Sequence, residues 1–335
     1  MNTTPARAVT IALALQGGGA HGAFTWGVLD RLLEEPWLSI EGISATSSGS
    51  MNALALAQGW LDGGAQNDER GGARVTLEAL WESIAAETSA LRWAFAGPTG
   101  STAETMLLGI TRHFTPKEIN PLDFNPVREI AAKLFDFERL REAKQHLFLA
   151  ATRVRDGRLA MFDREHLSLN ALLASVCLPQ LFAPVEIDGE MYWDGGYAGN
   201  PALEPLIYQC KCPDLLSVLV QPLEHSQPPT TMRQINERIV ELGFSTTFTR
   251  EVDTLLRAKD SLDRAFAISW IGRRVKALRL HIVDPGESLD DYGAKTRLNT
   301  RLGFLRGLRD LGRAQMQSWL ERNADALGRR GTFVR

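Results

Sequence analysis

The 335-residue chain has few of the residues from which disulfides and metal sites are built. Its three cysteines (Cys177, Cys210 and Cys212) are odd in number and form no CxxC pair, a usage typical of a reducing compartment. None of its six histidines is spaced as HxH or HxxxH, so no metal-ligand pattern is present. We therefore expect no bound metal and no other cofactor.

The chain also lacks a strong net charge and a long apolar run. Lysine and arginine total 37 against 40 acidic residues, for a net charge of −3, so no basic field indicates a nucleic-acid partner. No apolar run approaches the roughly 18–20 residues of a membrane-spanning helix. The composition, 44% hydrophobic and 23% charged, is that of an ordinary globular chain. We expect a cytoplasmic protein that binds no nucleic acid.

Two strand-to-helix turns follow one another near the start of the sequence. The apolar run 11–15 breaks into GGGAHG at 17–22, and the run 40–45 breaks into ATSSG at 45–49. A helical pattern follows each turn. This alternation predicts an α/β fold with a mostly parallel central sheet and helices on both faces.

The rest of the sequence divides into a core region, 9–220, and a mostly helical C-terminal extension, 221–335, that contributes one strand and packs on the same domain. A helical insertion is expected over about 75–145, and the glycine-rich, charged segment 59–73 is predicted to be a surface loop. Other expected elements are strands at 146–153, 159–162, 215–220 and 276–283, hairpin turns at 155–158 and 188–189, and helices at 167–176, 231–267 and 301–330.

The second turn presents Ser47 as a candidate nucleophile. Its neighbours two positions before and after, Ala45 and Gly49, are both small. A serine on a sharp strand-to-helix turn requires small residues there, because neighbouring strands leave no room for side chains. The helix that follows directs its amino end at the serine and favours negative charge. The alternative is an ordinary helix N-cap, for which serine is also preferred.

The first turn has three interpretations. It matches GxGxxG, the dinucleotide-binding fingerprint, but that motif needs a carboxylate at the end of the second strand. Here the strand ends in SATS, and Glu41 precedes its core. The glycines could simply permit tight packing of strand and helix. As an oxyanion hole, the turn would direct the backbone amides of Gly18 and Gly19 at a bound carbonyl oxygen. The candidate residues are Gly17, Gly18, Gly19, Ala20 and Gly22.

A serine hydroxyl needs a base, and no histidine stands in a suggestive context. Asp194 is the better candidate, since it ends an apolar strand within Tyr192-Trp193-Asp194-Gly195-Gly196. Burial beside aromatic rings raises the pKa of a carboxyl group and makes it a stronger base. The alternative is a structural turn, because Asp-Gly is a common turn dipeptide.

The order GGGxxG, AxSxG and DGG resembles the patatin-like phospholipase family over about residues 9–220. The segment Ala174–Pro179, followed by Phe182-Ala183-Pro184, is similar to the family's segment before its DGG turn. The resemblance implies a Ser–Asp dyad, with Ser47 as nucleophile and Asp194 as general base. It implies a serine acyl hydrolase of the phospholipase A, lysophospholipase or esterase type that cleaves lipid esters through an acyl-enzyme. The 17–22 turn would be the oxyanion hole, and the supporting turn residues would be Ala45, Gly49, Gly195 and Gly196.

Two residues depart from the family's pattern. Ala45 stands where the family usually has glycine, a change between small residues that negative φ would tolerate. His21 stands where many members carry arginine or lysine, so the sequence does not indicate which side chain would make an anion contact there. Neither change removes a reacting group. A non-catalytic regulatory or lipid-binding module on the same fold, and a dinucleotide-binding protein, are the alternative functions.

The segment 301–335 holds eight arginines and three acidic residues, with apolar residues at near-helical spacing. A basic amphipathic helix of this kind can lie on an anionic membrane surface, which would place the protein peripherally at the inner membrane. More often such a helix packs on its own domain with a solvated charged face, and we favour that arrangement.

Overall fold

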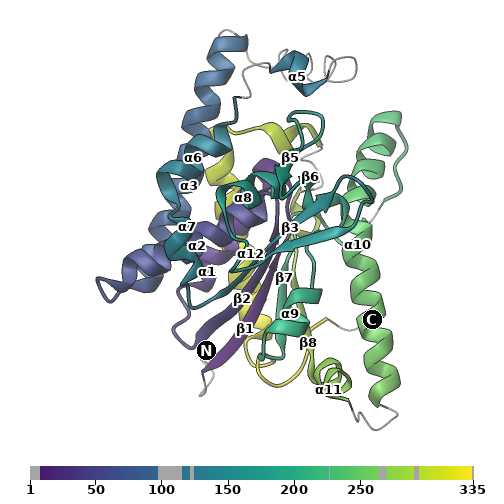
Figure 1. The fold of residues 1–335 in the computed structure, drawn as a ribbon. Helices are drawn as coiled ribbons and strands as arrows, with labels where there is room; N and C mark the ends of the chain where they lie inside the picture. Colours follow the sequence, from purple (N-terminus) through teal and green to yellow (C-terminus); the bar gives the residue numbers. More distant parts are fainter. Residues whose placement is uncertain are drawn as a thin grey trace.

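A computed structural model describes residues 8–96, 115–120, 124–225, 227–263, 269–289 and 294–333. Its centre is an eight-stranded sheet in the order β5-β6-β3-β2-β1-β7-β8, with β4 also paired to β3 (Figure 1). The strands are β1 (Val9–Leu15), β2 (Leu38–Thr46), β3 (His146–Arg153), β4 (Leu159–Phe162), β5 (Val185–Ile187), β6 (Glu190–Asp194), β7 (Asp214–Val218) and β8 (Arg279–Val283).

Most of the sheet is parallel. β1 pairs in parallel with both β2 and β7, and the parallel pairing extends outward to β3 and β8. β4 and β6 run antiparallel to β3, and β5 antiparallel to β6. The two predicted hairpins join β3 to β4 and β5 to β6, the second through Asp188 and Gly189, both at positive φ.

Helices cover both faces of this sheet, as the alternating pattern predicts. They are α1 (Gly22–Leu32), α2 (Ser48–Gly64), α3 (Glu69–Ala96), α5 (Pro116–Ile119), α6 (Pro126–Leu134), α7 (Phe137–Arg141), α8 (Leu169–Ser175), α9 (Glu204–Gln209), α10 (Met232–Asp263), α11 (Trp270–Ala277) and α12 (Leu302–Asn323). Short 3-10 helices are η1 (Gly19–His21), η3 (Gly195–Tyr197), η4 (Gly286–Leu289) and η5 (Ala294–Leu298). Figure 1 shows α1, α2 and α3 on one side of the sheet and α10 and α11 on the other.

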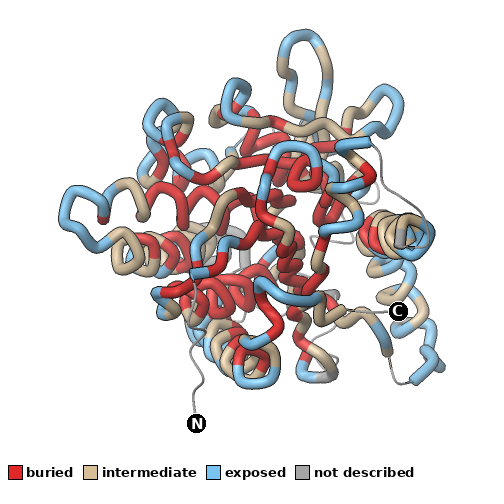
Figure 2. Tube along the Cα trace, turned by 90° about the horizontal axis from the view of Figure 1, so that it is seen from below, coloured by how far each residue is buried: buried red, intermediate tan, exposed pale blue. Residues whose placement is uncertain are grey.

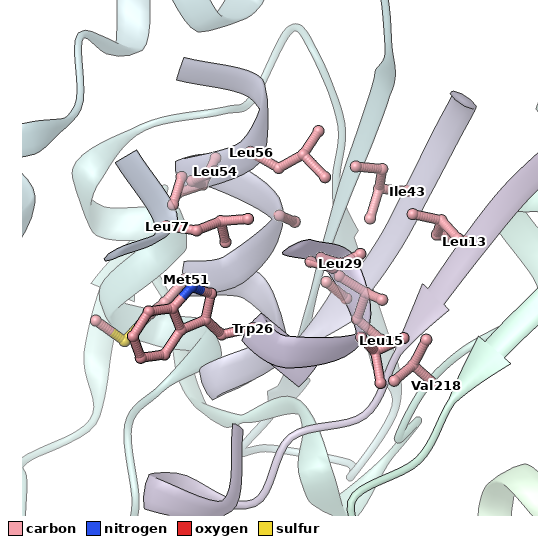
Figure 3. Packing of buried hydrophobic residues seen from close by; sticks show 14 of the residues in the cluster. Leu13, Leu15, Trp26, Leu29, Ile43, Met51, Leu54, Leu56, Leu77 and Val218 are labelled. Carbon is pink, nitrogen blue, oxygen red and sulfur yellow. The ribbon is translucent and has the colours of Figure 1, made fainter. Parts of the chain in front are cut away.

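The alternation of β1 divides the buried side chains into two cores. Leu13 and Leu15 join the core under α1, α2, α3 and α12, whereas Ala12 and Ala14 face the core under α9, α10 and α11. This is the two-residue period of a strand buried on both faces. Figure 3 shows leucines of α1, α2 and α3 packed toward the strands. In Figure 2 the buried residues fill the middle of the molecule, and the exposed ones line the outer loops.

The prediction of a surface loop at 59–73 is wrong. α2 continues to Gly64 and α3 begins at Glu69, so only a short turn separates them. The glycines lie where these two helices touch, and a Cβ added at Gly59 would collide with the carbonyl oxygen of Gly72. Glycine here permits close contact between helix backbones instead of breaking a helix.

The described part of the predicted 75–145 insertion is helical, and residues 97–114 and 121–123 of it lie outside the described residues. In the C-terminal extension, β8 pairs with β7 in the central sheet, and α12 packs along α1. Most apolar residues of α12 are buried, with Leu305 and Leu308 at 0% and 2% exposure. Among the described helices, no stretch combines the length and apolar character that crossing a bilayer requires.

The contact between α1 and α12 predicts opposite effects for two glycines of one helix. A Cβ at Gly312 would collide with the Phe24 carbonyl oxygen, whereas a Cβ at the exposed Gly307 would meet nothing within 4 Å. We expect Gly312→Ala to destabilise the protein by about 1–3 kcal/mol through overpacking. Gly307→Ala should stabilise it by about 0.5–1 kcal/mol through helix propensity. Urea unfolding of both variants measures the difference, and equal effects would contradict this packing.

Candidate active site

Ser47 occupies a strained turn between β2 and α2. Its backbone has φ 55° and ψ −126° at the N-cap of α2. Residues other than glycine rarely adopt such a conformation, and those that do are concentrated at functional sites. The Ser47 N–H donates to Ser175 Oγ at 3.2 Å, and Ser175 Oγ is hydrogen-bonded to Ser50 Oγ at 2.8 Å. Both of these supporting serines are fully buried, whereas Ser47 itself is half-buried. The turn is therefore stabilised by hydrogen bonds on its interior side.

The strands beneath this turn leave no room for larger residues. A Cβ added at Gly49 would collide with the carbonyl oxygen of Leu15 on β1. A Cβ at Gly17 would lie 2.5 Å from Ser47 Cβ and 2.6 Å from the Thr46 oxygen. Ala45, one of the two small neighbours of the serine, is completely buried in β2. The small residues in the motif are therefore explained by close packing of neighbouring strand ends.

The glycine turn directs only part of its amides toward solvent. The Gly17 N–H donates to Asn200 Oδ1 at 2.7 Å, and the Gly18 N–H donates to Ser48 Oγ at 3.1 Å. The amides of Gly19 and Ala20 donate to no residue in the described part of the chain. Gly19 is exposed, with φ 60°. The free donors of the turn thus lie at its second half, at the start of η1.

The last residue of the predicted oxyanion set has a packing role in the structure. Gly22 begins α1, and a Cβ there would lie 2.5 Å from Ser48 Oγ and 3.1 Å from the Trp81 ring. Its lack of a side chain lets α1 approach the first turn of α2.

Asp194 lies at the end of β6 with a carboxylate that is 1% exposed. Its Oδ1 accepts the Gly196 N–H at 2.8 Å, and its backbone is fixed by Cys177 and Thr152. Oδ2 is buried and accepts no hydrogen bond from any described residue. Burial raises the pKa of Asp194 to about 6, against the opposing influence of the nearby Ser47 hydroxyl and the Gly196 amide.

The structure therefore brings the predicted nucleophile and base together. Ser47 is close enough to favour the charged form of Asp194, although no hydrogen bond of ordinary length joins them. Such bonds are often long before substrate binds. The glycines after Asp194 are again sites of close packing: a Cβ at Gly195 would collide with the Ala150 oxygen, and one at Gly196 with the Phe244 ring.

No histidine competes for the role of base among the five that the structure describes. His21 directs its ring away from the glycine turn, with Nε2 2.8 Å from Thr296 Oγ1. Burial, with the positive charge of Arg297 nearby, lowers the pKa of His21 to about 3, so the ring is neutral. His281 is buried against Asp214, 3.0 Å away, and packs on the Trp319 ring of α12.

Two observations bear on cofactors. Glu41, the carboxylate of β2, accepts the backbone N–H groups of Lys211 and Cys212 at 2.7 Å each, so it is engaged away from the glycine turn. Among the described residues, no cluster of three His, Cys, Asp or Glu side chains could hold a metal ion.

Three residues of the site were missed in the sequence. Asn200 clamps Gly17 from both sides, through Oδ1 and through a 3.3 Å bond from Nδ2 to the Gly17 oxygen. Ser175 accepts the Ser47 amide, and Ser48 accepts the Gly18 amide. The signals available were the Asn200-Pro201 dipeptide shortly after the aspartate turn and the serine within Ala174–Pro179.

A cavity of about 520 Å³ lies beside the site, lined by residues of α5, α6, α8 and the segment 177–186. It is bordered by Cys177, whose carbonyl oxygen accepts the Asp194 N–H. Ser47 and the glycine turn are not among its lining residues, so the cavity adjoins the base and does not cover the serine.

This combination of strained serine, glycine turn and buried aspartate agrees with the sequence comparisons. The sequence model of the patatin-like phospholipase family matches residues 13–207, more than half of the chain. The chain belongs to this family.

Curated relatives and a solved structure are also similar to it. Patatin-like phospholipase domain-containing protein 6 of Homo sapiens and of Mus musculus is 28% identical over 195 residues, 57% of this chain and 12% of the relative. The chain thus spans only a small part of these relatives' length. The crystal structure of VipD from Legionella pneumophila covers 90% of this chain and 67% of its own, at 15% identity and a TM-score of 0.38, too low to bear on function.

The raised pKa of Asp194 predicts a pH-dependent stability cost. Because the folded pKa of about 6 lies above the ordinary aspartate value of 3.8, the folded state holds this proton more tightly. The carboxyl group therefore lowers the free energy of unfolding as pH rises from about 4 through 6, by about 3 kcal/mol when fully ionised. Asp194→Asn should be more stable than the wild type by about 1–3 kcal/mol at pH 8.

Urea unfolding at pH 4 and pH 8 checks this prediction. The gain should shrink at pH 4, where the wild-type carboxyl is protonated in the folded state. A difference that stays the same at both pH values would contradict it.

Proposed function

We propose that this protein is a serine acyl hydrolase that cleaves the carboxylic esters of lipids, with Ser47 as nucleophile and Asp194 as general base. The observation that supports this best is the buried Oδ2 of Asp194, which no described residue satisfies and which belongs to a carboxylate close to a strained, half-buried serine. Unsatisfied buried acceptors are costly, and strained backbones are concentrated at active sites.

In the first half of the reaction, Asp194 takes the proton from Ser47 Oγ as this oxygen attacks the ester carbonyl carbon. The amides at Gly19 and Ala20 stabilise the resulting oxyanion, together with the amino end of α2. The Gly18 amide would join them once its bond to Ser48 opens. Collapse of the tetrahedral intermediate breaks the C–O bond of the ester, and Asp194 returns the proton to the departing alcohol.

In the second half, the acyl group is esterified to Ser47, and water takes the place of the alcohol. Asp194 accepts a proton from this water as it attacks the acyl carbon, and then returns a proton to Ser47 Oγ when the fatty acid leaves. A dyad suffices because the carboxylate is both buried and adjacent. Burial raises its basicity into the range in which a base works near neutral pH.

Lipid esters as substrates follow from membership of the patatin-like phospholipase family and from the names of the curated relatives. For a chain that matches 12% of those relatives, this is an inference from the shared region. We propose that residues 9–220 carry the chemistry and that 221–335 form an extension packed on them.

A cytoplasmic location with peripheral membrane contact through 301–330 is also a proposal. The membrane contact would be electrostatic, made by basic side chains and not by apolar ones. The apolar stripe of α12 is buried against α1. Two of its arginines are paired within the chain, Arg306 with Glu82 at 2.6 Å and Arg313 with Glu34 at 2.8 Å. Exposed Arg322 and Arg329 would make the contact with anionic lipid.

Substitution of the dyad tests the function directly. We expect Ser47→Ala and Asp194→Asn each to lower kcat for p-nitrophenyl butyrate by at least about 10³-fold, because each removes a reacting group. Circular dichroism and thermal unfolding check that both variants are folded. Ser44→Ala, at a buried serine of β2 whose Oγ makes no hydrogen bond with any described residue, is the matched control and should retain most of the activity. Hydrolysis that persists in Ser47→Ala would exclude Ser47 as the nucleophile. A wild-type serine that no fluorophosphonate probe labels would support a non-catalytic module instead.

The pH profile tests the base. Since Asp194 acts only when ionised, kcat/KM should rise with pH through about 6, the pKa to which burial raises this carboxyl group, and level off above it. Stopped-time assays with p-nitrophenyl butyrate from pH 4.5 to 8.5 measure this limb. A limb near pH 4 would mean that the essential carboxyl is an exposed one.

A further inference from the structure

Arg297 of η5 lies against the glycine turn although it is 278 residues from Gly19 in sequence. A Cβ added at Gly19 would lie 2.5 Å from the Arg297 carbonyl oxygen. The preceding residue, Thr296, is hydrogen-bonded to the ring of His21 in the same turn. The C-terminal extension thus places an arginine beside the amides of Gly19 and Ala20, which donate to no described residue.

The guanidinium group of Arg297 is poorly satisfied for a group with so little solvent contact. Its side chain is 15% exposed, and its ion pair with Glu241 of α10 is long at 3.6 Å. Its Nε is buried and donates no hydrogen bond to any described residue. A buried guanidinium normally uses several of its five N–H donors, and leaving them unused is costly.

The surroundings of Glu241 would let Arg297 exchange its partner. Glu241 is also contacted by Arg238 at 3.4 Å and by His225 at 3.3 Å, so it keeps the guanidinium of Arg238 as a partner if Arg297 turns away. Phe244, three residues along the same face of α10, packs on Gly196 beside the base. Arg297 therefore lies between the glycine turn and the helix that covers the aspartate turn.

We propose that Arg297 binds the phosphodiester of a phospholipid substrate and so selects phospholipids over uncharged esters. The proposal rests on the hydrolase function proposed above. In a glycerophospholipid the phosphate is only a few bonds from the ester, which suits a cation next to the oxyanion donors. A phosphate oxygen satisfies guanidinium N–H groups in the planar, charge-assisted geometry that arginine favours. Arg297 also supplies a positive charge beside the glycine turn, where the ring of His21 is neutral.

The test compares lysophosphatidylcholine with the monoacylglycerol of the same acyl chain, both in uncharged mixed micelles. These substrates share the ester and differ only in the phosphocholine. In Arg297→Gln, kcat/KM for the phospholipid should fall about 10- to 100-fold, mainly through KM. For the monoacylglycerol it should stay within about twofold. Arg297→Lys should be intermediate, because charge is kept and the planar fork is lost.

Arg238→Gln is the matched control, since it removes the same charge from the same partner without touching the glycine turn. Both substrates should be cleaved within about twofold of the wild-type rate. If Arg297→Gln loses activity equally on both substrates, or if Arg238→Gln reproduces its selectivity, Arg297 is structural and the proposal is wrong.

A soluble competitor gives an independent readout that does not depend on micelles. Glycerophosphocholine should inhibit p-nitrophenyl butyrate hydrolysis competitively in the wild type and not in Arg297→Gln, whereas glycerol should inhibit neither. Inorganic phosphate that competes as strongly would identify a free-anion site and overturn the lipid assignment. If the wild type cleaves no ester at all, the proposed function fails. Calorimetric binding of glycerophosphocholine to wild type and Arg297→Gln then decides the role of Arg297.

Discussion

The site depends on three turns that approach one another so closely that no side chains fit between them. The ends of β1, β2 and β6 carry the glycine turn, the serine and the aspartate, and a Cβ added at Gly17, Gly49 or Gly195 would collide with a neighbouring backbone or with Ser47. This packing forces Ser47 into its unusual φ and ψ and shields Asp194 from water. The same close contacts therefore place the proposed nucleophile beside the proposed base.

Shielding has an energetic consequence for the fold. The Asp194 carboxyl group is buried, and burial raises its pKa to about 6, so its ionised form costs folding free energy. Oδ2 accepts no hydrogen bond from any described residue, which adds to this cost. The large apolar cores on both faces of the sheet offset it. The burial that destabilises the ionised carboxylate also raises its pKa, and the raised pKa is what makes it a stronger base near neutral pH.

Local patterns predicted much of the fold and identified the candidate reacting residues, because each depends on neighbours in sequence. The parallel sheet follows from repeated strand–turn–helix units, and Ser47 and Asp194 from motifs a few residues long. Arg297 and Asn200 could not be found this way, since their partners lie 278 and 183 residues away. The glycine-rich segment 59–73 was wrongly predicted to be a loop, because glycine is common both in turns and where two helices touch. Only packing distinguishes the two.

The contact between α1 and α12 has a consequence for how the chain folds. Gly27 and Gly312 place these helices backbone to backbone, yet nearly the whole sequence separates them. Closing so long a loop costs entropy before any contact repays it, and pairings of this kind form slowly. During synthesis, the serine and aspartate segments would both have been made well before α12 could cover α1. Completion of the hydrophobic core therefore waits for α12.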